Sequence, residues 1–408
     1  MNVLQINNYH NLRGGSERVF LETAKLLTQK GHVVKYFSKT ENNEEVEFNN
    51  NLILKRSNYS SKNVFSRIIH TPQFIWSIYN AKSLDDYLSK NKFDIAHLHI
   101  FYGELSNSIL PILKKHKIPT VMSVHEYRMI CPVYTFINGK GEICEKCKGK
   151  LYYNAIRYRC NKNNLLYSII SAAETTFRDF FTPYEKYIDH FIMVSNFIRE
   201  KHIQYKPHIE KKSSVIYNFV NLNEYNFSQT SKSYLFYFGR LSSEKGIITL
   251  IEALKFYPSM ILKIAGSGPD EQLIKDYLEK ENLTNIELLG FKSGEELKEL
   301  ISFAKFTVVP SEWYENNPMT VIESLSSGTP VIGANIGGIP EIVIENKTGF
   351  IFDSGNVESL IRTINKAINI DSLDYSLLRQ NARNFAEATF YSENHYKKLI
   401  KVYENVLK

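Results

Sequence analysis

The chain has 408 residues, of which 43% are apolar, and its formal net charge at pH 7 is +7. This length and apolar fraction let the chain bury real cores and favour two domains over one oversized core. No apolar run is long enough to span a bilayer, and the first residues, MNVLQINNYH, lack the basic and then apolar pattern of a signal peptide. We therefore expect a cytoplasmic protein.

The positive charge is concentrated in the first half of the chain. Counting Lys and Arg against Asp and Glu gives +11 for residues 1–230 and −4 for residues 231–408, and residues 101–170 alone contribute +7. A basic surface on one half favours an anionic partner there, such as a phosphate-bearing substrate or the inner leaflet of a membrane. Scattered, solvated lysines are the alternative interpretation.

In the first half, short apolar runs alternate with helical patterns. The expected strands are VLQINN (3–8), HVVKYF (32–37), IAHLHI (95–100), TVMSVHE (120–126), HFIMVS (190–195) and SVIYNFV (214–220). Strands separated by helices predict a parallel sheet with covered faces. The acidic, Asn-rich stretch at 41–51 is expected to be a surface loop.

The same alternation returns in the second half. The expected strands are YLFYFGR (234–240), ILKIAG (261–266), IELLGF (286–291), FTVVPS (306–311), PVIGA (330–334) and GFIFD (349–353). The polar stretch at 221–233 has no period and is interpreted as a linker. The pattern predicts an α/β protein of two Rossmann-like parallel-sheet domains that face each other across a cleft.

Open parallel sheets bind ligands at the carboxyl ends of their strands. After the first strand, Gly14 and Gly15 precede a helix whose expected cap is Ser16. Paired glycines let the backbone approach a ligand, and the free amides of a helix start favour an anion. A plain tight turn explains the two glycines equally well.

In the second half, Arg240 follows the first strand and Lys245 follows one turn later, with Gly246 just inside the next helix. An arginine fork and a lysine point charge suit a diphosphate, although surface ion pairing is an alternative. The nearby IAGSGPDEQL (264–273) imitates a dinucleotide fingerprint, but Glu271 occupies the third glycine position. A nicotinamide-dependent oxidoreductase is therefore disfavoured.

The stretch EWYENNPMTVIESLSSGTPV (312–331) contains two acids around a helix start. Asn317 is the expected cap of a helix from Pro318 to about Ser327. Glu323 lies beside the apolar stripe of that helix, and Glu315 lies in the loop before it. Two carboxylates at two depths suit a ligand with two polyols, such as a sugar and a ribose. Solvated surface charge is the alternative.

Together these segments resemble family 4 glycosyltransferases with the GT-B fold. The matching motifs, in order, are GGSERV, FGRLSSEKGI, IAGSGP, the Glu-x7-Glu from Glu315 to Glu323, SLSSGTPVIGANIGGIPEIV and NKTGFIFD. The resemblance covers essentially the whole chain and is most specific from Leu235 to Asp353. It implies a retaining enzyme that takes a sugar from a nucleotide diphosphate donor and needs no metal at its active site.

The resemblance also implies roles for individual residues. Arg240 and Lys245 match the pair that binds the diphosphate and stabilises its growing charge. Glu323 matches the acid that holds the donor ribose, and Glu315 matches the acid near the donor sugar. The loop amides of the family's donor site match Asn317, Pro318 and Met319, and its glycine loop over the diphosphate matches Gly14 and Gly15.

On the acceptor side, His125 matches an active-site histidine near the reacting centre. Asn218 begins YNFVN, where the family often has Asn-Gly-Val-Asp, so Phe219 and Asn221 depart from the pattern. Retention is compatible with front-face attack, which we favour, or with a covalent intermediate on a carboxylate.

All four cysteines lie in one short segment, Cys131, Cys144, Cys147 and Cys160. Because disulfides are unusual in the cytosol, this spacing favours a structural zinc over four reduced thiols. The same segment interleaves basic and aromatic residues, which suits an anionic membrane or a pyrophosphate-linked lipid acceptor. A nucleic-acid partner is disfavoured.

The predicted domains are residues 1–222 with a Cys-rich insertion at 131–160, residues 233–385 for the nucleotide sugar, and a helix at 386–408 that returns to the first domain. The predicted function is a retaining glycosyltransferase that acts on a glycan or lipid-linked acceptor, in surface polysaccharide or glycolipid synthesis. A sugar-nucleotide epimerase of the same fold and a non-catalytic nucleotide-sugar binding protein are the alternatives. We expect the protein in the cytoplasm, with peripheral contact to the inner face of the membrane.

Overall fold

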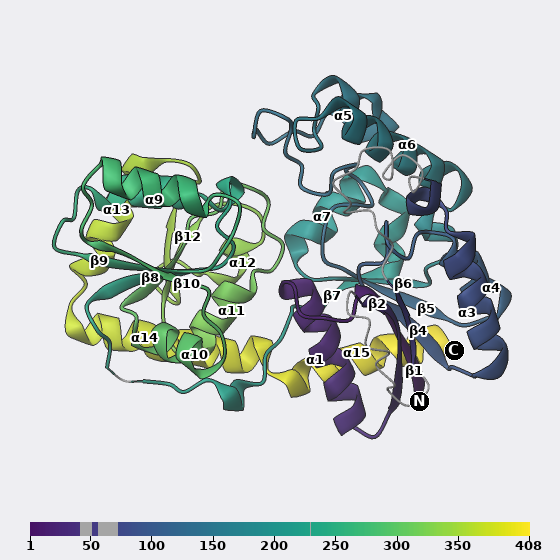
Figure 1. Cartoon of the computed structure of the whole chain (residues 1–408). Helices are drawn as coiled ribbons and strands as arrows, with labels where there is room; N and C mark the ends of the chain where they lie inside the picture. The colour runs from purple at the N-terminus through teal and green to yellow at the C-terminus, as the bar shows by residue number, and fades with distance from the viewer. Residues whose placement is uncertain (41–50, 56–71, 229) are drawn as a thin grey trace. The chain divides into compact units, whose positions relative to one another are not determined.

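A computed structural model describes residues 1–40, 51–55, 72–228 and 230–408. These residues form two compact units, each with its own parallel sheet (Figure 1). Unit 1 comprises Met1–Ile216 and Tyr396–Lys408, and unit 2 comprises Tyr217–His395. The expected Asn-rich loop at 41–51 lies, apart from Asn51, outside the described residues.

The sheet of unit 1 has the strand order β3-β2-β1-β4-β5-β6-β7 and is parallel throughout. Its strands are β1 (Asn2–Tyr9), β2 (Val33–Thr40), β3 (Leu52–Lys55), β4 (Ile95–Leu98), β5 (Thr120–Val124), β6 (His190–Met193) and β7 (Ser213–Val215). The helices of this unit are α1 (Gly15–Gln29), α3 (Ile78–Lys90), α4 (Ile109–Lys115), α5 (Tyr153–Arg157), α6 (Leu165–Phe181) and α7 (Asn196–Tyr205). The pattern of the sequence predicts six of these strands and misses β3.

The sheet of unit 2 has the order β10-β9-β8-β11-β12-β13 and is also parallel. Its strands are β8 (Tyr234–Phe238), β9 (Ile261–Ala265), β10 (Ile286–Gly290), β11 (Phe306–Val309), β12 (Val331–Ala334) and β13 (Gly349–Phe352). The helices are α8 (Ile247–Leu254), α9 (Glu271–Lys280), α10 (Gly294–Phe303), α11 (Met319–Ser326), α12 (Ile339–Ile342), α13 (Val357–Ile368) and α14 (Ser372–Phe390). All six strands of this half are predicted from the sequence.

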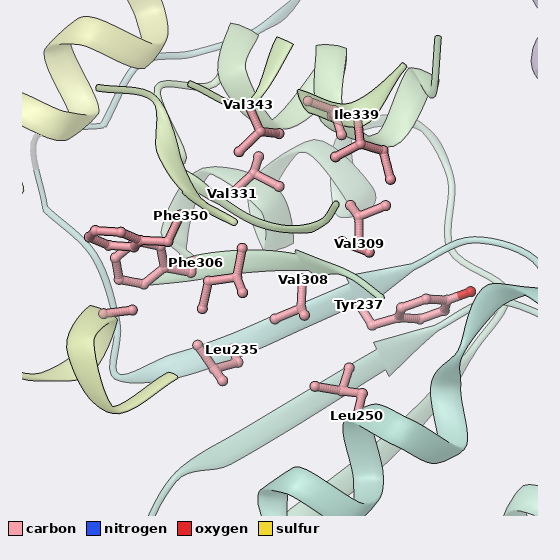
Figure 2. Close-up of a cluster of buried hydrophobic side chains, with 14 of the residues drawn as sticks. Leu235, Tyr237, Leu250, Phe306, Val308, Val309, Val331, Ile339, Val343 and Phe350 are labelled. Atoms are coloured by element: carbon pink, nitrogen blue, oxygen red, sulfur yellow. The ribbon is translucent and has the colours of Figure 1, made fainter. Parts of the chain in front are cut away.

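The core of unit 2 explains why its strands are continuous apolar runs. Leu235, Phe306 and Val331, from three neighbouring strands, are fully buried and pack together (Figure 2). Helices cover a parallel sheet on both faces, so side chains that point either way must be apolar. The centre of the sheet is thereby rigid, and the loops at its carboxyl edge are held by a fixed scaffold.

The boundaries of the two units differ from the predicted domains. The division falls between Ile216 and Tyr217, ahead of the predicted linker at 221–233. Leu222 and Tyr225 of that stretch are buried in the core of unit 2, which a solvated linker would not allow. The last helix, α15 (Ser392–Leu407), contributes to unit 1 from Tyr396 onward, whereas the sequence places this return at 386.

No helix within the described ranges combines the length and apolarity needed to cross a bilayer.

Candidate active site

The loop after β8 positions the two predicted cations at the carboxyl edge of the unit 2 sheet. Arg240 is exposed, and Lys245 ends a 3-10 turn that spans Ser243–Lys245. Gly246 follows with φ of 67°, and a Cβ there would lie 1.9 Å from the carbonyl oxygen of Pro310. Only glycine allows this approach. The loop after β8 can therefore pack against the loop after β11, where Glu315 lies.

Glu315 is a buried carboxylate, with only 5% of its surface exposed. Its Oε1 accepts three hydrogen bonds, from Lys245 Nζ at 2.6 Å, Ser311 Oγ at 2.8 Å and Trp313 Nε1 at 2.9 Å. Burial alone would raise the pKa of Glu315, but the Lys245 ammonium and these donors outweigh it and hold the pKa below its usual range. The carboxylate is therefore charged at neutral pH.

The second oxygen of Glu315 is differently placed. No hydrogen bond joins Oε2 to any residue in the described part of the chain. A carboxylate whose one oxygen is saturated and whose other oxygen has no protein donor is suited to accept from a ligand hydroxyl. The Glu315 loop is itself fixed from behind, because the Gly338 amide donates to Glu315 O at 2.7 Å. A Cβ on Gly337 would lie 2.2 Å from the same oxygen.

Glu323 is also buried, with 6% of its surface exposed, although it lies on α11. Its Oε1 accepts a hydrogen bond from the phenol of Tyr225 at 3.0 Å. The predicted position of Glu323 at the buried margin of the helix is confirmed. Solvated surface charge does not describe either acid, because both side chains are almost fully covered.

The start of α11 differs from the prediction. The helix begins at Met319 with Pro318 at the N-cap position, and no side chain caps it. Asn317 instead accepts from the Asn218 amide at 2.8 Å, and Asn218 Nδ2 donates to Asn317 O at 3.1 Å. Asn317 bonds to this distant residue because the backbone amide of Asn218 is buried and needs an acceptor. The Asn317 Nδ2 group is buried without an acceptor among the described residues.

The glycines of IAGSGP serve backbone packing. A Cβ on Gly266 would lie 1.8 Å from Gly239 O, and one on Gly268 would lie 2.1 Å from Leu241 O. These glycines therefore let the loop after β9 touch the loop that carries Arg240. The resemblance to a dinucleotide fingerprint comes from this close contact between two loops of the same sheet edge.

In unit 1, His125 follows β5 and meets His99, which follows the neighbouring strand β4. His125 Nε2 lies 2.9 Å from His99 Nδ1, and the two rings stack with centroids 5.2 Å apart. The ring of Phe20, from α1, packs edge-on against His99 at 5.4 Å between centroids. The helix that follows the glycine loop is thus packed directly on this histidine pair.

The glycine loop also differs locally from the prediction. Gly14 is the N-cap of α1, with an extended backbone, and Gly15 is the first helical residue. The Ser16 hydroxyl donates to the carboxylate of Glu17 at 3.1 Å and does not cap the helix. Gly14 and Gly15 are exposed, so their amides are accessible at the helix start.

Glu126, beside His125, is a titratable group that the sequence did not indicate. Burial raises the pKa of Glu126 to about 7, against the lowering effects of Arg128 and of the nearby phenol of Tyr102. The nearby carboxylate of Glu17 raises the pKa further. The first turn of α1 and the residues after β5 are therefore close enough to interact electrostatically.

The four cysteines are free thiols. Burial, followed by the charges of Cys131, Cys160 and Cys144, raises the pKa of Cys147 to about 12, so the four sulfurs lie within electrostatic reach of one another. Nevertheless, within the described ranges no three His, Cys, Asp or Glu side chains form a group that could hold a metal ion. The structural zinc gains no support from this arrangement and stays a prediction.

Several site residues were missed because their roles depend on long-range contacts. Trp313 and Ser311 carry a signal in the sequence, since donors beside an acid on one loop favour a hydrogen-bonded cluster. The sequence carries no such signal for Tyr225, because this residue lies in a stretch without hydrophobic periodicity. His99 could have been noticed, as it ends a predicted strand in a His-Leu-His pattern at the same edge as His125.

Two parallel-sheet units with loops of this kind at their carboxyl edges define the GT-B class of protein. The model of the family described as "Glycosyltransferase Family 4" matches residues 13–224, and that of "Glycosyl transferases group 1" matches residues 221–387. The chain therefore belongs to glycosyltransferase family 4.

One sequence relative is itself named a glycosyltransferase, and two solved structures share the fold. The chain is 31% identical, over 218 residues, to an uncharacterized glycosyltransferase of Methanocaldococcus jannaschii, and the match spans 53% of this chain and 60% of that protein. A glycosyltransferase from Rickettsia africae has a similar structure, with a TM-score of 0.71, 21% identity and coverage of 100% and 98% of the two chains. The Anabaena protein HepE, in complex with UDP-glucose, matches with a TM-score of 0.68, 16% identity and coverage of 99% and 100%.

Proposed function

We propose that this protein transfers a sugar, with retention of anomeric configuration, from a nucleotide diphosphate donor to a hydroxyl of a glycan or lipid-linked acceptor. The observation that carries the proposal is the buried Glu315 carboxylate, which is paired with Lys245 at one oxygen and has no donor among the described residues at the other. HepE, which shares the fold, binds UDP-glucose.

In the proposed reaction, Arg240 and Lys245 bind the diphosphate of the donor. Negative charge grows on the leaving diphosphate as the glycosidic bond breaks, and fixed cations stabilise it. Lys245 is partly buried, its ammonium lies over the Trp313 ring at 5.0 Å, and Glu315 holds it at 2.6 Å. A lysine fixed in this way loses little entropy when it binds phosphate, which supports its role in the transition state.

The two acids of unit 2 would bind the two polyols of the donor. Oε2 of Glu315 would accept from a sugar hydroxyl, and Nδ2 of Asn317, which has no acceptor in the described part of the chain, would donate to another. Glu323, next to Tyr225, would accept from the ribose hydroxyls. The backbone amide of Met319, the first residue of α11, would add the positive end of a helix.

The acceptor would be activated on the side of unit 1. His125 would orient the acceptor hydroxyl or share its developing charge, and the exposed amides of Gly14 and Gly15 would approach the diphosphate. In front-face attack, the acceptor proton passes to the leaving phosphate oxygen. The new glycosidic bond then forms on the face from which the diphosphate leaves, which gives retention.

Helix α6 of unit 1 supports a membrane-bound acceptor, because it buries polar side chains and exposes apolar ones. Helix α6 buries the polar side chains of Ser171, Glu174 and Arg178, each at most 2% exposed. It exposes Ile169 (42%) and Phe180 (77%), along with Leu165, Leu166 and Phe181. The preceding segment exposes basic side chains, which are Lys146, Lys148, Lys150, Arg157, Arg159 and Lys162. Exposed apolar side chains on α6 and exposed cationic side chains in the segment before it are both suited to an anionic bilayer.

The donor site is tested by thermal shift with a panel of nucleotide sugars, followed by turnover assays with the best ligand. One donor should raise the melting temperature of the wild type by several degrees, because it binds only the folded state. Glu323→Gln keeps the side-chain volume and should melt near the wild type without ligand but lose most of the shift. If no nucleotide sugar shifts the wild type, the proposed function is wrong.

Analysis of the product distinguishes retention from inversion, and a transferase from an epimerase or a binding protein. With the best donor and its acceptor, NMR of the product should show the anomeric configuration of the donor. An inverted product would contradict retention alone. Epimerised donor without acceptor would identify an epimerase, and donor binding without any turnover would identify a binding protein.

A further inference from the structure

Asn218 joins the first residues of unit 2 to the loop before α11. Its backbone amide donates to Asn317 Oδ1 at 2.8 Å, and its side-chain Nδ2 donates to Asn317 O at 3.1 Å. Asn218 is 7% exposed and Asn317 is 4% exposed, so both hydrogen bonds are shielded from solvent. Two bonds between one pair of residues fix the Asn317 backbone and also the direction of its side chain.

The bond from the Asn218 amide decides which way the side-chain amide of Asn317 points. A backbone N–H can only donate, so the Asn317 atom that faces it must be the oxygen Oδ1. The nitrogen Nδ2 is therefore turned away from the Asn218 amide. This nitrogen is buried and has no acceptor in the described part of the chain. A buried N–H group without an acceptor costs free energy, and an acceptor atom of a bound ligand would remove that cost.

The segment that carries Asn218 is itself anchored within unit 2. The Val220 amide donates to Phe390 O, at the end of α14, at 3.2 Å. The ring of Phe219, one of the two departures from the family pattern, packs on His395 with centroids 4.1 Å apart. Asn218 is therefore held from both of its flanks' contacts, and it gives the loop before α11 a fixed support.

We propose that Asn218 is a positioning residue that directs Nδ2 of Asn317 toward the sugar of the bound donor. Helix α11 has no side-chain cap, because Asn317 is engaged by Asn218. The expected cap residue thus serves the ligand, and the site favours a sugar with a hydrogen-bond acceptor, such as a hydroxyl oxygen, at this point. The inference rests on the proposed function, since it takes the ligand to be a nucleotide sugar. The direction of the Asn317 amide is a property of unit 2 alone.

Three variants separate this role from a merely structural one. Asn218→Ala removes the side-chain bond to Asn317 O, and Asn317→Leu removes both polar atoms of the side-chain amide. Asn285→Ala is the matched control, because Asn285 Nδ2 also donates to backbone carbonyls of unit 2, those of Tyr257 and Met260, at 3.1 Å each. Asn285 lies just before β10, at the sheet edge opposite to the Asn317 loop.

The measurement compares the binding of a nucleotide sugar with that of its nucleoside diphosphate by calorimetry. UDP-glucose and UDP are the first pair, followed by the pair that gives the largest thermal shift. Asn218→Ala should raise the Kd of the nucleotide sugar about 3-fold to 10-fold, the usual range for one lost hydrogen bond, and leave that of the diphosphate within about 2-fold. Asn285→Ala should lower stability but change neither Kd by more than about 2-fold.

A double-mutant cycle tests whether Asn218 acts through Asn317. In the Asn317→Leu background, Asn218→Ala should leave the Kd of the nucleotide sugar within about 2-fold, because Nδ2 is already lost. Equal losses of affinity in the two backgrounds would overturn the inference. Asn218→Ala would also overturn it by weakening the diphosphate as much as the nucleotide sugar, because a purely structural role affects both ligands.

The direction of the Asn317 amide is measured without any ligand. By NMR-detected hydrogen exchange, the backbone amide of Asn218 should be protected in the wild type and exchange faster in Asn317→Leu, because its acceptor is lost. Equal protection in the two proteins would contradict the orientation on which the inference depends. Failure of the proposed function gives a different result: no nucleotide sugar would bind the wild type, although the exchange of the Asn218 amide would still depend on Asn317.

Discussion

Glu315 is buried and Glu126 is partly buried, and their surroundings move the pKa values of the two carboxyl groups in opposite directions. Glu315 meets an ammonium and two further donors, so its pKa is held below the usual range despite burial. For Glu126, the interactions that favour the charged form are weaker than the effect of burial, which raises its pKa to about 7. Perturbed carboxyl groups of this kind gather at functional sites, but the environment decides which form each one takes.

Removing the charge of Glu315 should uncouple Lys245 from its fixed position. We expect Glu315→Gln to lower kcat/KM at least about 100-fold, the range typical for a lost electrostatic contact in the transition state. The stability cost should be about 1–3 kcal/mol, because the buried donors lose a charged acceptor. Steady-state kinetics and urea unfolding measure both quantities.

Glu312→Gln is the matched control for this prediction. Glu312 lies on the same loop and accepts from Thr249 Oγ1 at 2.5 Å, and among the described residues no hydrogen bond or ion pair joins it to Lys245. Its replacement should leave kcat/KM within about 3-fold of the wild type. Equal losses in the two variants would show that the loop, and not the Glu315–Lys245 pair, controls activity.

The raised pKa of Glu126 predicts how stability depends on pH. Between the usual value near 4.5 and about 7, the folded state keeps a proton that the unfolded state has released. The stability of the wild type should therefore fall as pH rises through this window, by at most about 1.4 kcal/mol per pH unit for one proton. Urea unfolding from pH 5 to pH 8 measures it. The stability of Glu126→Gln should fall less steeply with pH than that of the wild type. Parallel stability profiles of the two proteins would contradict the raised pKa of Glu126.

At the scale of elements, the short loops at the carboxyl edge of unit 2 act as one assembly. Gly246, Gly266 and Gly337 each allow a backbone approach that no other residue could make without a shift. These contacts bring the loops after β8, β9, β11 and β12 together. The site is therefore built on contacts between loops, which hold Lys245 beside Glu315 before any donor binds.

Helix α6 gives a prediction about membrane binding. Replacing Ile169, Phe180 and Phe181 by serine should weaken binding to vesicles that contain phosphatidylglycerol at least about 10-fold, because the exposed apolar area is lost. Sedimentation with vesicles measures the effect, and binding of the wild type should also fall with salt.

Helix α14 supplies the control, since Leu373 is 81% exposed and Leu377 is 58% exposed in unit 2. Serine at these two positions should not change vesicle binding. If the α6 variant binds as well as the wild type, or if neutral vesicles bind equally, the membrane surface is not where we propose it.

At the scale of the whole molecule, the end of the chain completes a core that begins at its start. Leu399, Val402 and Tyr403 of α15 pack with Val3 of β1 and Ile95 of β4. A chain truncated after His395 should therefore lose roughly 5 kcal/mol of stability in unit 1, from three buried side chains at about 1.5–3 kcal/mol each.

Hydrogen exchange is the measurement that localises this effect. Amides of β1 and β4 should exchange faster in the truncated chain, while those of β8 and β11 should keep their protection, because unit 2 has its own core. Equal loss of protection in both units would show that they unfold as one body.

Local pattern was sufficient for most of the fold. Each predicted strand corresponds to an observed one, because strands buried on both faces must be continuous apolar runs. Strand β3 was missed, since LILK is short and follows a polar stretch. Helix α11 ends within one residue of the prediction, because Gly328 takes the left-handed conformation, with φ of 68°, that favours glycine.

The sequence by itself determined the strands, the parallel class of both sheets and the burial of Glu323, because periodicity and turn residues act over a few positions. Only the tertiary structure decided which side chains meet. Lys245 reaches Glu315 across 70 positions, Asn317 prefers Asn218 to its own helix, and His99 lies beneath His125. Such pairs depend on strand order, which brings distant loops to one edge, and no local pattern carries that information.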